Sequence, residues 1–172
     1  MSPELWQIIP NDIQILRDLL LRKRELSRHP IMDERRELWN RHASLDSKRP
    51  MILAETSGVL DEIVPLATLL CQADWARTME RSLRETIFRV EQVKDDWVLE
   101  PRIEYLWFIE TGDYGVHTEL VRGQNEGRLG SYHWNPPITD LDRDIDSLRF
   151  RSLSVNREKT AAWKNHLEEL FG

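Results

Sequence analysis

The chain has 172 residues, of which 40% are hydrophobic and 31% charged, so a folded domain is expected rather than a disordered chain. The net charge of −6 disfavours generic nucleic-acid binding, which relies on Lys and Arg to neutralise phosphates. No apolar run is long enough to span a bilayer, no secretory signal is recognised, and Cys71 is the single cysteine. We therefore expect a cytoplasmic protein without an internal disulfide that binds neither nucleic acid nor a membrane.

Two helices and a short strand are expected in the first third of the chain. Asn11 or Asp12 is expected to cap the first helix, because both side chains accept hydrogen bonds from the free N–H groups of a helix start. A second helix is expected after Met32, with Asp33 as its cap. Residues 51–54 are expected to form a short buried strand.

The strongest helix pattern and the strongest strand pattern are adjacent. Apolar residues recur at steps of three or four over residues 74–93, which places them on one helix face. Over residues 97–109 the odd positions are aromatic, aliphatic or proline, whereas the even positions through Glu104 are mostly charged. This period of two predicts a strand with one face in the core, and Pro101 indicates an edge strand or a bulge.

A β-hairpin is expected between residues 115 and 134. Its tip is expected to be centred on Asn125, with a glycine on each side. In this register His117 lies opposite His133, and Glu119 shares their face. Imidazole and carboxylate groups so placed are suitable ligands for a divalent metal ion. The alternative is a solvent-exposed pair of histidines. It is favoured, because no third ligand stands out and a shifted register would separate the pair.

The end of the hairpin contains two aromatic residues and two prolines. The expected register turns Tyr132 and Trp134 toward the core, on the face opposite to His133. Pro136 and Pro137 follow at once. Because each proline ring removes a backbone N–H and fixes φ, the chain is expected to leave the sheet there.

Carboxylates alternate along residues 140–146 in a spacing similar to that of a calcium loop. The spacing fails at the position of the required glycine, which is Ile145, and at that of the final glutamate, which is Arg151. An acidic turn or helix start is therefore expected. Asn156 is expected to cap a final helix, with Gly172 at its C-terminal end.

Cysteine and tryptophan often serve catalysis or binding, so each needs an interpretation. Cys71 follows an apolar stretch and has no base near it in the sequence, which favours a buried structural thiol over a nucleophile. Several of the seven tryptophans fall on predicted apolar faces. Trp6 and Trp39, however, lie near helices with few apolar residues, so we expect them to contribute to an interaction surface.

Six short segments form a series that runs from the second helix to the last residue. They are RRELWNRH (35–42), RPMI (49–52), DDWVLEP (95–101), TGDYGV (111–116), SYHWNPPI (131–138) and LEELFG (167–172). As a series, these segments resemble the N-terminal region of uroporphyrinogen-decarboxylase-like proteins. The resemblance is to the branch found in anaerobes, often linked to corrinoid-dependent methyl transfer, and it covers most of the chain from about Glu34 onward.

In such proteins this region precedes a (β/α)₈ barrel, which carries the active site on its C-terminal face. The resemblance implies that residues 1–172 are a single accessory domain, cut from a longer protein or encoded as a remnant. It implies no catalytic, cofactor-binding or metal-binding residue in this chain, and zinc and a corrinoid partner for a full-length parent. The arginine-bearing segment with which the decarboxylase binds its substrate is not recognisable, so tetrapyrrole decarboxylation is not implied.

The expected fold class is α+β. N-terminal helices and one long amphipathic helix would pack on a small, mostly antiparallel sheet that contains the hairpin. The expected function is that of an accessory domain that packs on the barrel and shapes its entrance or a homodimer surface. Two alternatives stay open: a stand-alone interaction module with a Trp-rich surface, and a small metal-binding protein that uses His117, His133 and Glu119.

Overall fold

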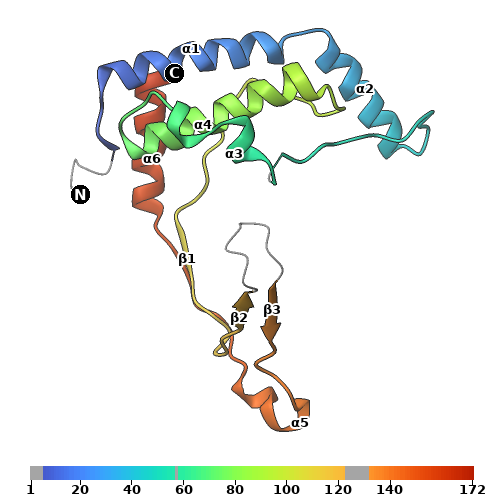
Figure 1. Cartoon of the computed structure of the whole chain (residues 1–172), viewed down its shortest axis with the longest axis vertical. Coiled ribbons are helices and arrows are strands. Elements are labelled where there is room, and N and C mark those ends of the chain that lie inside the picture. Colours follow the sequence, from blue (N-terminus) through green and yellow to red (C-terminus); the bar gives the residue numbers. More distant parts are fainter. Residues whose placement is uncertain (1–5, 57, 123–131) are drawn as a thin grey trace. The chain divides into compact units, whose positions relative to one another are not determined.

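The computed structural model describes residues 6–56, 58–122 and 132–172 (Figure 1). Within these ranges the fold is α+β, with six α-helices and two antiparallel sheets of two strands each. The chain divides into two compact units, Met1–Ile103 and Glu104–Gly172, which are described in turn. The expected role as one accessory domain stays a prediction. None of the helices in the described ranges is long and apolar enough to cross a membrane.

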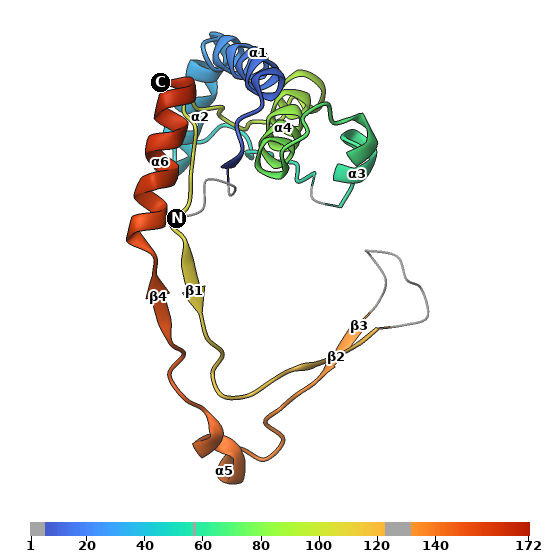
Figure 2. The ribbon, with the colours of Figure 1, turned by 90° about the vertical axis from the view of Figure 1, so that its left-hand side faces the viewer.

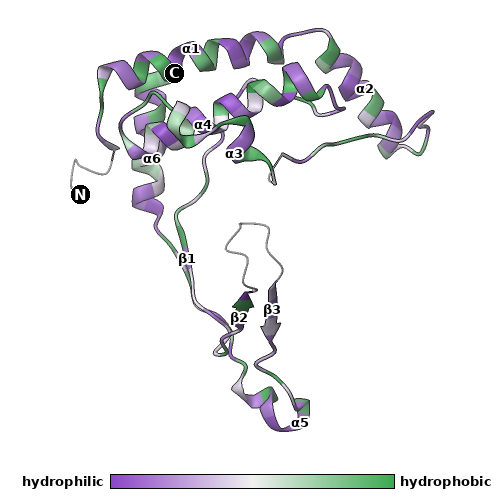
Figure 3. Ribbon diagram, in the orientation of Figure 1, coloured by the Kyte–Doolittle hydropathy of each residue, from purple (hydrophilic) through white to green (hydrophobic). Residues whose placement is uncertain are grey.

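The first unit is a group of helices joined by irregular segments (Figures 1 and 2). Its elements are α1 (Pro10–Ser27), α2 (Ile31–Ala43), α3 (Leu60–Ile63), the 3₁₀ turn η2 (Leu66–Thr68), α4 (Asp74–Phe88) and the π-helical η3 (Arg89–Val93). α1 and α4 lie side by side and form the most extensive contact between elements. In Figure 3 apolar and polar residues alternate along both helices, as expected when each helix buries one face.

α1 and α4 supply much of the apolar core of this unit. Ile13 and Leu16 of α1 and Ala76 and Leu83 of α4 are at most 6% exposed. Met32 of α2 adds a side chain that is fully buried. Full burial of a large aliphatic side chain stabilises a fold by roughly 1.5–3 kcal/mol, so this contact is a main source of the unit's stability.

The N-caps expected for the first two helices are wrong. α1 begins at Pro10, whose fixed φ suits a first helical position, and no side chain caps it. Asp12 lies inside the helix and is fully buried, so its carboxylate is used for a tertiary contact instead. α2 begins at Ile31 without a side-chain cap, and Asp33 lies in its first turn.

The helix expected over residues 74–93 is confirmed. α4 covers its first fifteen residues and η3 continues it in π-helical geometry. Lys94 then adopts the left-handed conformation, with a φ of 55°, and this ends the helix.

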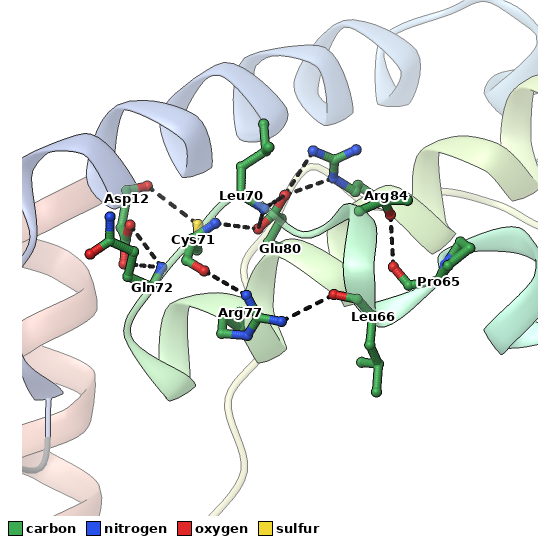
Figure 4. A network of polar contacts seen from close by, with 10 residues as sticks. Asp12, Pro65, Leu66, Leu70, Cys71, Gln72, Arg77, Glu80 and Arg84 are labelled. Atoms are coloured by element: carbon green, nitrogen blue, oxygen red, sulfur yellow. Dashed lines mark hydrogen bonds and ion pairs between the residues drawn. The ribbon is translucent and has the colours of Figure 1, made fainter.

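Two buried carboxylates, Asp12 of α1 and Glu80 of α4, hold the irregular segment between η2 and α4 (Figure 4). The carboxylate of Glu80 accepts hydrogen bonds from the backbone N–H groups of Leu70 and Cys71, at 2.8 to 3.0 Å. The carboxylate of Asp12 accepts hydrogen bonds from the N–H groups of Gln72 and Ala73, at 2.9 to 3.0 Å. Because buried N–H groups without a partner are costly, these bonds fix the path of a segment that has no regular structure.

Arginines of α4 complete this network (Figure 4). Arg84 balances the charge of Glu80, with 2.7 Å between Nη2 and Oε1. Burial alone would raise the pKa of Glu80, but the backbone hydrogen bonds hold that pKa below its ordinary value. Arg77 donates to the carbonyl oxygens of Cys71, at 2.8 Å, and Leu66, at 3.1 Å. The irregular segment therefore finds side-chain partners for its N–H groups and for its carbonyl groups.

A second pair of carboxylates, Asp95 and Asp96, holds the segment that precedes α3. Asp96 accepts from both terminal nitrogens of Arg49, at 2.6 and 2.7 Å, and from the N–H of Ile52 at 2.8 Å. Asp95 accepts from the N–H of Ala54 at 3.0 Å. The strand expected over residues 51–54 is therefore wrong, because aspartate side chains take the hydrogen bonds that a strand would give to a neighbour.

The strand expected over residues 97–109 is also wrong for most of its length. Only its last residue belongs to a strand, β1 (Ile109–Thr111). The carbonyl oxygen of Trp97 accepts from Nη1 of Arg35, a side chain of α2, at 2.9 Å. At Trp97, a tertiary contact with α2 thus takes the place of the ladder that the period of two predicted.

The second unit contains two separate two-stranded ribbons and a C-terminal helix (Figure 2). Its elements are β1, β2 (Glu119–Arg122), β3 (Tyr132–Asn135), α5 (Leu141–Asp144), η4 (Ile145–Ser147), β4 (Leu153–Val155) and α6 (Arg157–Phe171). β1 pairs with β4 and β2 pairs with β3, both antiparallel. β3 ends directly before Pro136, so the double proline ends the strand as expected.

Side-chain caps begin both helices of this unit. Asn156 caps α6 as expected, because its Oδ1 accepts from the N–H of Lys159 at 2.9 Å. Asp140 caps α5 by accepting from the N–H of Arg143 at 3.3 Å. The acidic run at 140–146 is thus a helix start, as expected.

The hairpin is present, but its register differs from the expected one. Trp134 pairs with Leu120 rather than with Val116. A shift by an even number of residues keeps every side chain on its face, so Leu120, Tyr132 and Trp134 still share one face. This face is not in the core, because the three residues are 54%, 58% and 58% exposed. The expected tip of the hairpin lies outside the described residues.

Replacing Glu80 by alanine should destabilise the first unit strongly. The change leaves the N–H groups of Leu70 and Cys71, and the half-buried guanidinium of Arg84, without their acceptor. Each buried donor left without a partner costs about 1–3 kcal/mol. Urea unfolding followed by circular dichroism measures this loss. The matched control is Glu25→Ala, which removes an exposed partner of Arg22 and should cost at most about 1 kcal/mol. Equal losses in the two variants would contradict the role given to Glu80.

The stability of the protein should fall in acid partly through Asp96. Hydrogen bonds from Arg49 and, secondarily, from the N–H of Ile52 lower the pKa of Asp96 from 3.8 to about 2. A carboxylate with a depressed folded-state pKa contributes stability that is present above its ordinary pKa and lost as the pH falls through the folded value. Wild type should therefore lose more free energy of unfolding between pH 4 and pH 2 than Asp96→Asn.

Urea unfolding at a series of pH values tests this dependence. Arg49→Met removes the side-chain donor and should reproduce part of the flattening seen in Asp96→Asn. Profiles that run parallel in wild type and both variants would show that this contact does not set the acid dependence.

Candidate functional site

The three sequence-based metal candidates do not come together in the structure. His133 in β3 pairs across the hairpin with Val121, not with His117. His117 precedes β2, and its Nε2 lies 3.1 Å from Oδ2 of Asp113. The register shift therefore separates the two histidines along the ribbon.

Glu119 is engaged within the ribbon. Its Oε2 accepts a hydrogen bond from Nδ2 of Asn135 at 2.9 Å. Across residues 6–56, 58–122 and 132–172, no three His, Cys, Asp or Glu side chains are grouped so that they could hold a metal ion. The described part of the chain thus offers no set of ligands for zinc.

Cys71 is a buried thiol, as expected, and is 1% exposed. Burial, and secondarily the neighbouring carboxylate of Glu80, raise the pKa of this thiol to about 12. A nucleophilic cysteine needs the opposite, a lowered pKa and access to a substrate. Cys71 therefore belongs to the core.

One hollow of about 500 Å³ lies along α4. Its two arginines are engaged by the protein itself: Arg77 donates to two carbonyl oxygens, and Arg81 pairs with Asp61. Asp74 and Glu85 also line the hollow, so positive and negative side chains are balanced. The hollow therefore carries no excess of one charge that would favour a ligand of the opposite charge.

A groove of about 410 Å³ contains Trp39, one of the two tryptophans expected at an interaction surface, and we call it the tryptophan groove. Its lining residues are Arg36, Trp39, Asn40, Leu53, Trp97, Val98 and Glu100. Trp6, the other candidate, is half-buried and is not among them. Three segments of the resemblance series, 35–42, 49–52 and 95–101, lie at or beside the groove. The structure thus brings together motifs that lie far apart in the sequence.

The walls of the tryptophan groove are held in place by hydrogen bonds and ring contacts. Nε1 of Trp39 donates to the carbonyl oxygen of Asp96 at 2.8 Å. The guanidinium of Arg89 lies over the ring of Trp97, 4.4 Å from its centroid, and also pairs with Asp95 at 2.8 Å. The two indoles are therefore pre-positioned rather than free to rotate.

The rim of the tryptophan groove carries positively and negatively charged side chains. Arg36 lies 2.7 Å from a carboxylate oxygen of Asp33 and 3.5 Å from one of Glu100. An apolar floor with a polar rim is the usual arrangement of a surface that receives an apolar side chain of a partner. The lining of the tryptophan groove thus has the composition of such a surface, and none of its seven residues is a serine, cysteine or lysine that could act as a nucleophile.

The second unit exposes most of its large apolar side chains. Among its described residues, only Thr160 and Leu167 are buried. Outside the hairpin, the exposed large apolar side chains are Tyr105, Leu106, Trp107, Ile109, Tyr114, Leu141, Ile145, Leu148, Phe150 and Leu153, which we call the apolar arm. Leu106 is 85% and Phe150 103% exposed. Sequence reasoning expected one face of residues 97–109 to lie in a core and made no prediction for the apolar residues at 141–153, so it missed this surface.

Comparison of the chain with protein-family models, with curated proteins and with solved structures finds no match.

Cys71 should be unreactive toward a thiol reagent in the folded protein. With a pKa of about 12, only about one thiol in 10,000 is ionised at pH 8, and burial blocks access as well. Reaction with Ellman's reagent at pH 8 measures this directly. The same protein in 6 M guanidinium chloride should react fully within minutes. Rapid stoichiometric labelling of the folded chain would contradict the structural role of Cys71.

Proposed function

We propose that this chain is an accessory interaction domain of a uroporphyrinogen-decarboxylase-like enzyme, located before a (β/α)₈ barrel. The observation that supports this proposal is the apolar arm of the second unit. Monomeric proteins rarely expose contiguous apolar patches larger than a few hundred Å², and larger ones mark surfaces that bind other proteins or domains. In this proposal the barrel covers the apolar arm.

The size of the apolar arm agrees with such a role. Its ten side chains are between 39% and 103% exposed. Large side chains present roughly 150–250 Å² when aromatic and somewhat less when aliphatic, so the arm exposes on the order of 1,000 Å² of apolar surface. A standard interface buries about 800 Å² on each partner. The total apolar area of the arm is therefore comparable to one side of such an interface.

The first unit would act as the folded support of this contact. Its helices bury their own core, and its irregular segments are held by the carboxylates of Asp12, Glu80, Asp95 and Asp96. Because this unit has its own core and its irregular segments are hydrogen-bonded, we expect it to fold without the barrel. The second unit, whose strands are exposed on both faces, gains most from being covered.

The chemistry of the proposed parent enzyme follows from the resemblance. It would move a methyl group from a small methylated substrate to a corrinoid protein, with zinc held by the barrel. The described residues of this chain offer no group of three metal ligands, so neither metal binding nor a catalytic step is assigned to them. The role proposed for this chain is to pack on the barrel and to shape its surroundings.

A second candidate function is that of a stand-alone interaction module. The tryptophan groove favours it, because Trp39 and Trp97 are fixed in place beside Leu53 and accessible from solvent. A reading frame that stops after codon 172 would support this candidate. A frame that continues into the apolar strand pattern of a barrel would support the accessory domain.

Binding of the dye ANS, which fluoresces on exposed apolar surface, tests the proposed function. Residues 1–172 alone should bind the dye strongly, and a protein extended through the following reading frame should bind much less. Leu106→Ser and Phe150→Ser should reduce dye binding of the short chain, because both residues lie in the apolar arm. Leu21→Ser, at a residue of the first unit that is 55% exposed, is the matched control and should change it little.

Two results would end the proposal. One is a short chain that binds no dye. The other is a longer protein that binds as much dye per molecule as the short chain does.

A further inference from the structure

One face of the β2–β3 hairpin is apolar and exposed, and we call it the hairpin face. Its apolar residues are Leu120, Tyr132 and Trp134, which are 54%, 58% and 58% exposed, and Arg122, the cross-strand partner of Tyr132, lies on the same face. Leu120 and Trp134 are direct cross-strand partners, and the rings of Tyr132 and Trp134 lie 6.3 Å apart between centroids. This cluster is distinct from the apolar arm, which lies outside the hairpin. We propose that the hairpin face binds the same face of a second copy of this chain.

A hairpin of this kind needs a partner. A two-stranded ribbon is at best marginally stable in water unless a third strand or another element packs on it. β2 pairs only with β3 in its sheet, and every described residue of both strands is exposed. Face-to-face packing of two hairpins, about 10 Å apart, would convert two exposed ribbons into a small two-layer core.

The distribution of charge indicates a second copy as the partner. In a symmetric dimer the same patch meets itself, so like charges near its centre would repel each other. The centre of the hairpin face, the pair Leu120 and Trp134, is uncharged. Its charged residue, Arg122, lies at the end of β2. The opposite face carries Glu119 and His133 and does not suit self-association.

The area of the hairpin face predicts a weak dimer. Three side chains that are slightly more than half exposed present roughly 350 Å² of apolar surface per copy, on the scale of large side chains. Since interfaces are about 60% apolar, the full contact would bury about 1,200 Å² over both copies. This lies at the lower limit of stable complexes, so a dissociation constant on the order of micromolar is expected.

Sedimentation equilibrium of the chain over a wide concentration range tests this inference. Wild type should associate reversibly into a dimer. Leu120→Asp should raise the dissociation constant at least tenfold, because it places two carboxylates at the centre of the contact. Val121→Asp, on the next residue of the same strand but on the opposite face, is the matched control and should change it less than twofold.

A second pair of variants guards against local misfolding of the hairpin. Trp134→Ala removes apolar surface from the hairpin face without adding charge, and His133→Ala is its control on the other face. The first should weaken the dimer and the second should not.

Three results would overturn the inference. They are a monomer at several hundred micromolar, a dimer that Leu120→Asp and Trp134→Ala leave intact, and a dimer that the controls weaken equally. The inference does not rest on the proposed barrel contact, because the sedimentation test changes only residues of the hairpin and the dye-binding test changes only residues outside it. Failure of either proposal can therefore be recognised separately.

Discussion

Buried carboxylates that accept hydrogen bonds from irregular backbone determine how the first unit is built. Asp12 and Glu80 extend from the paired helices α1 and α4 toward the same segment, residues 70–73. A carboxylate can be buried only if its charge and its acceptor atoms are satisfied, and here the N–H groups of that segment and Arg84 satisfy them. The pairing of the helices and the path of the segment are therefore fixed together, since any other arrangement leaves buried polar groups unpaired.

The two units differ in how they use apolar residues. The first unit buries part of them in a core between helices, although Leu21 and Leu45 are among those left exposed, and it holds its irregular segments with aspartate and glutamate side chains. The second unit leaves them exposed, in the apolar arm and on the hairpin face. This contrast is what the proposed function depends on, because a folded support that carries an uncovered apolar surface is suited to binding another domain or a second copy.

Local patterns in the sequence were sufficient for some features and not for others. The period of the helix at 74–93 and the cap Asn156 depend on residues a few positions apart, and both predictions are confirmed. The contact between Asp12 and Gln72 joins residues sixty positions apart, so no local pattern could reveal it. Trp134 was assigned to the correct face but to the wrong environment, because periodicity does not show what covers a face.

Amide hydrogen exchange of residues 70–73, measured by NMR, tests the central claim most directly. These residues have no regular structure, yet each N–H donates to a buried carboxylate. The account predicts slow exchange, similar to that of α1 and α4, and a loss of protection at Leu70 and Cys71 in Glu80→Ala. Exchange in wild type as fast as in an exposed loop such as residues 45–48 would contradict it.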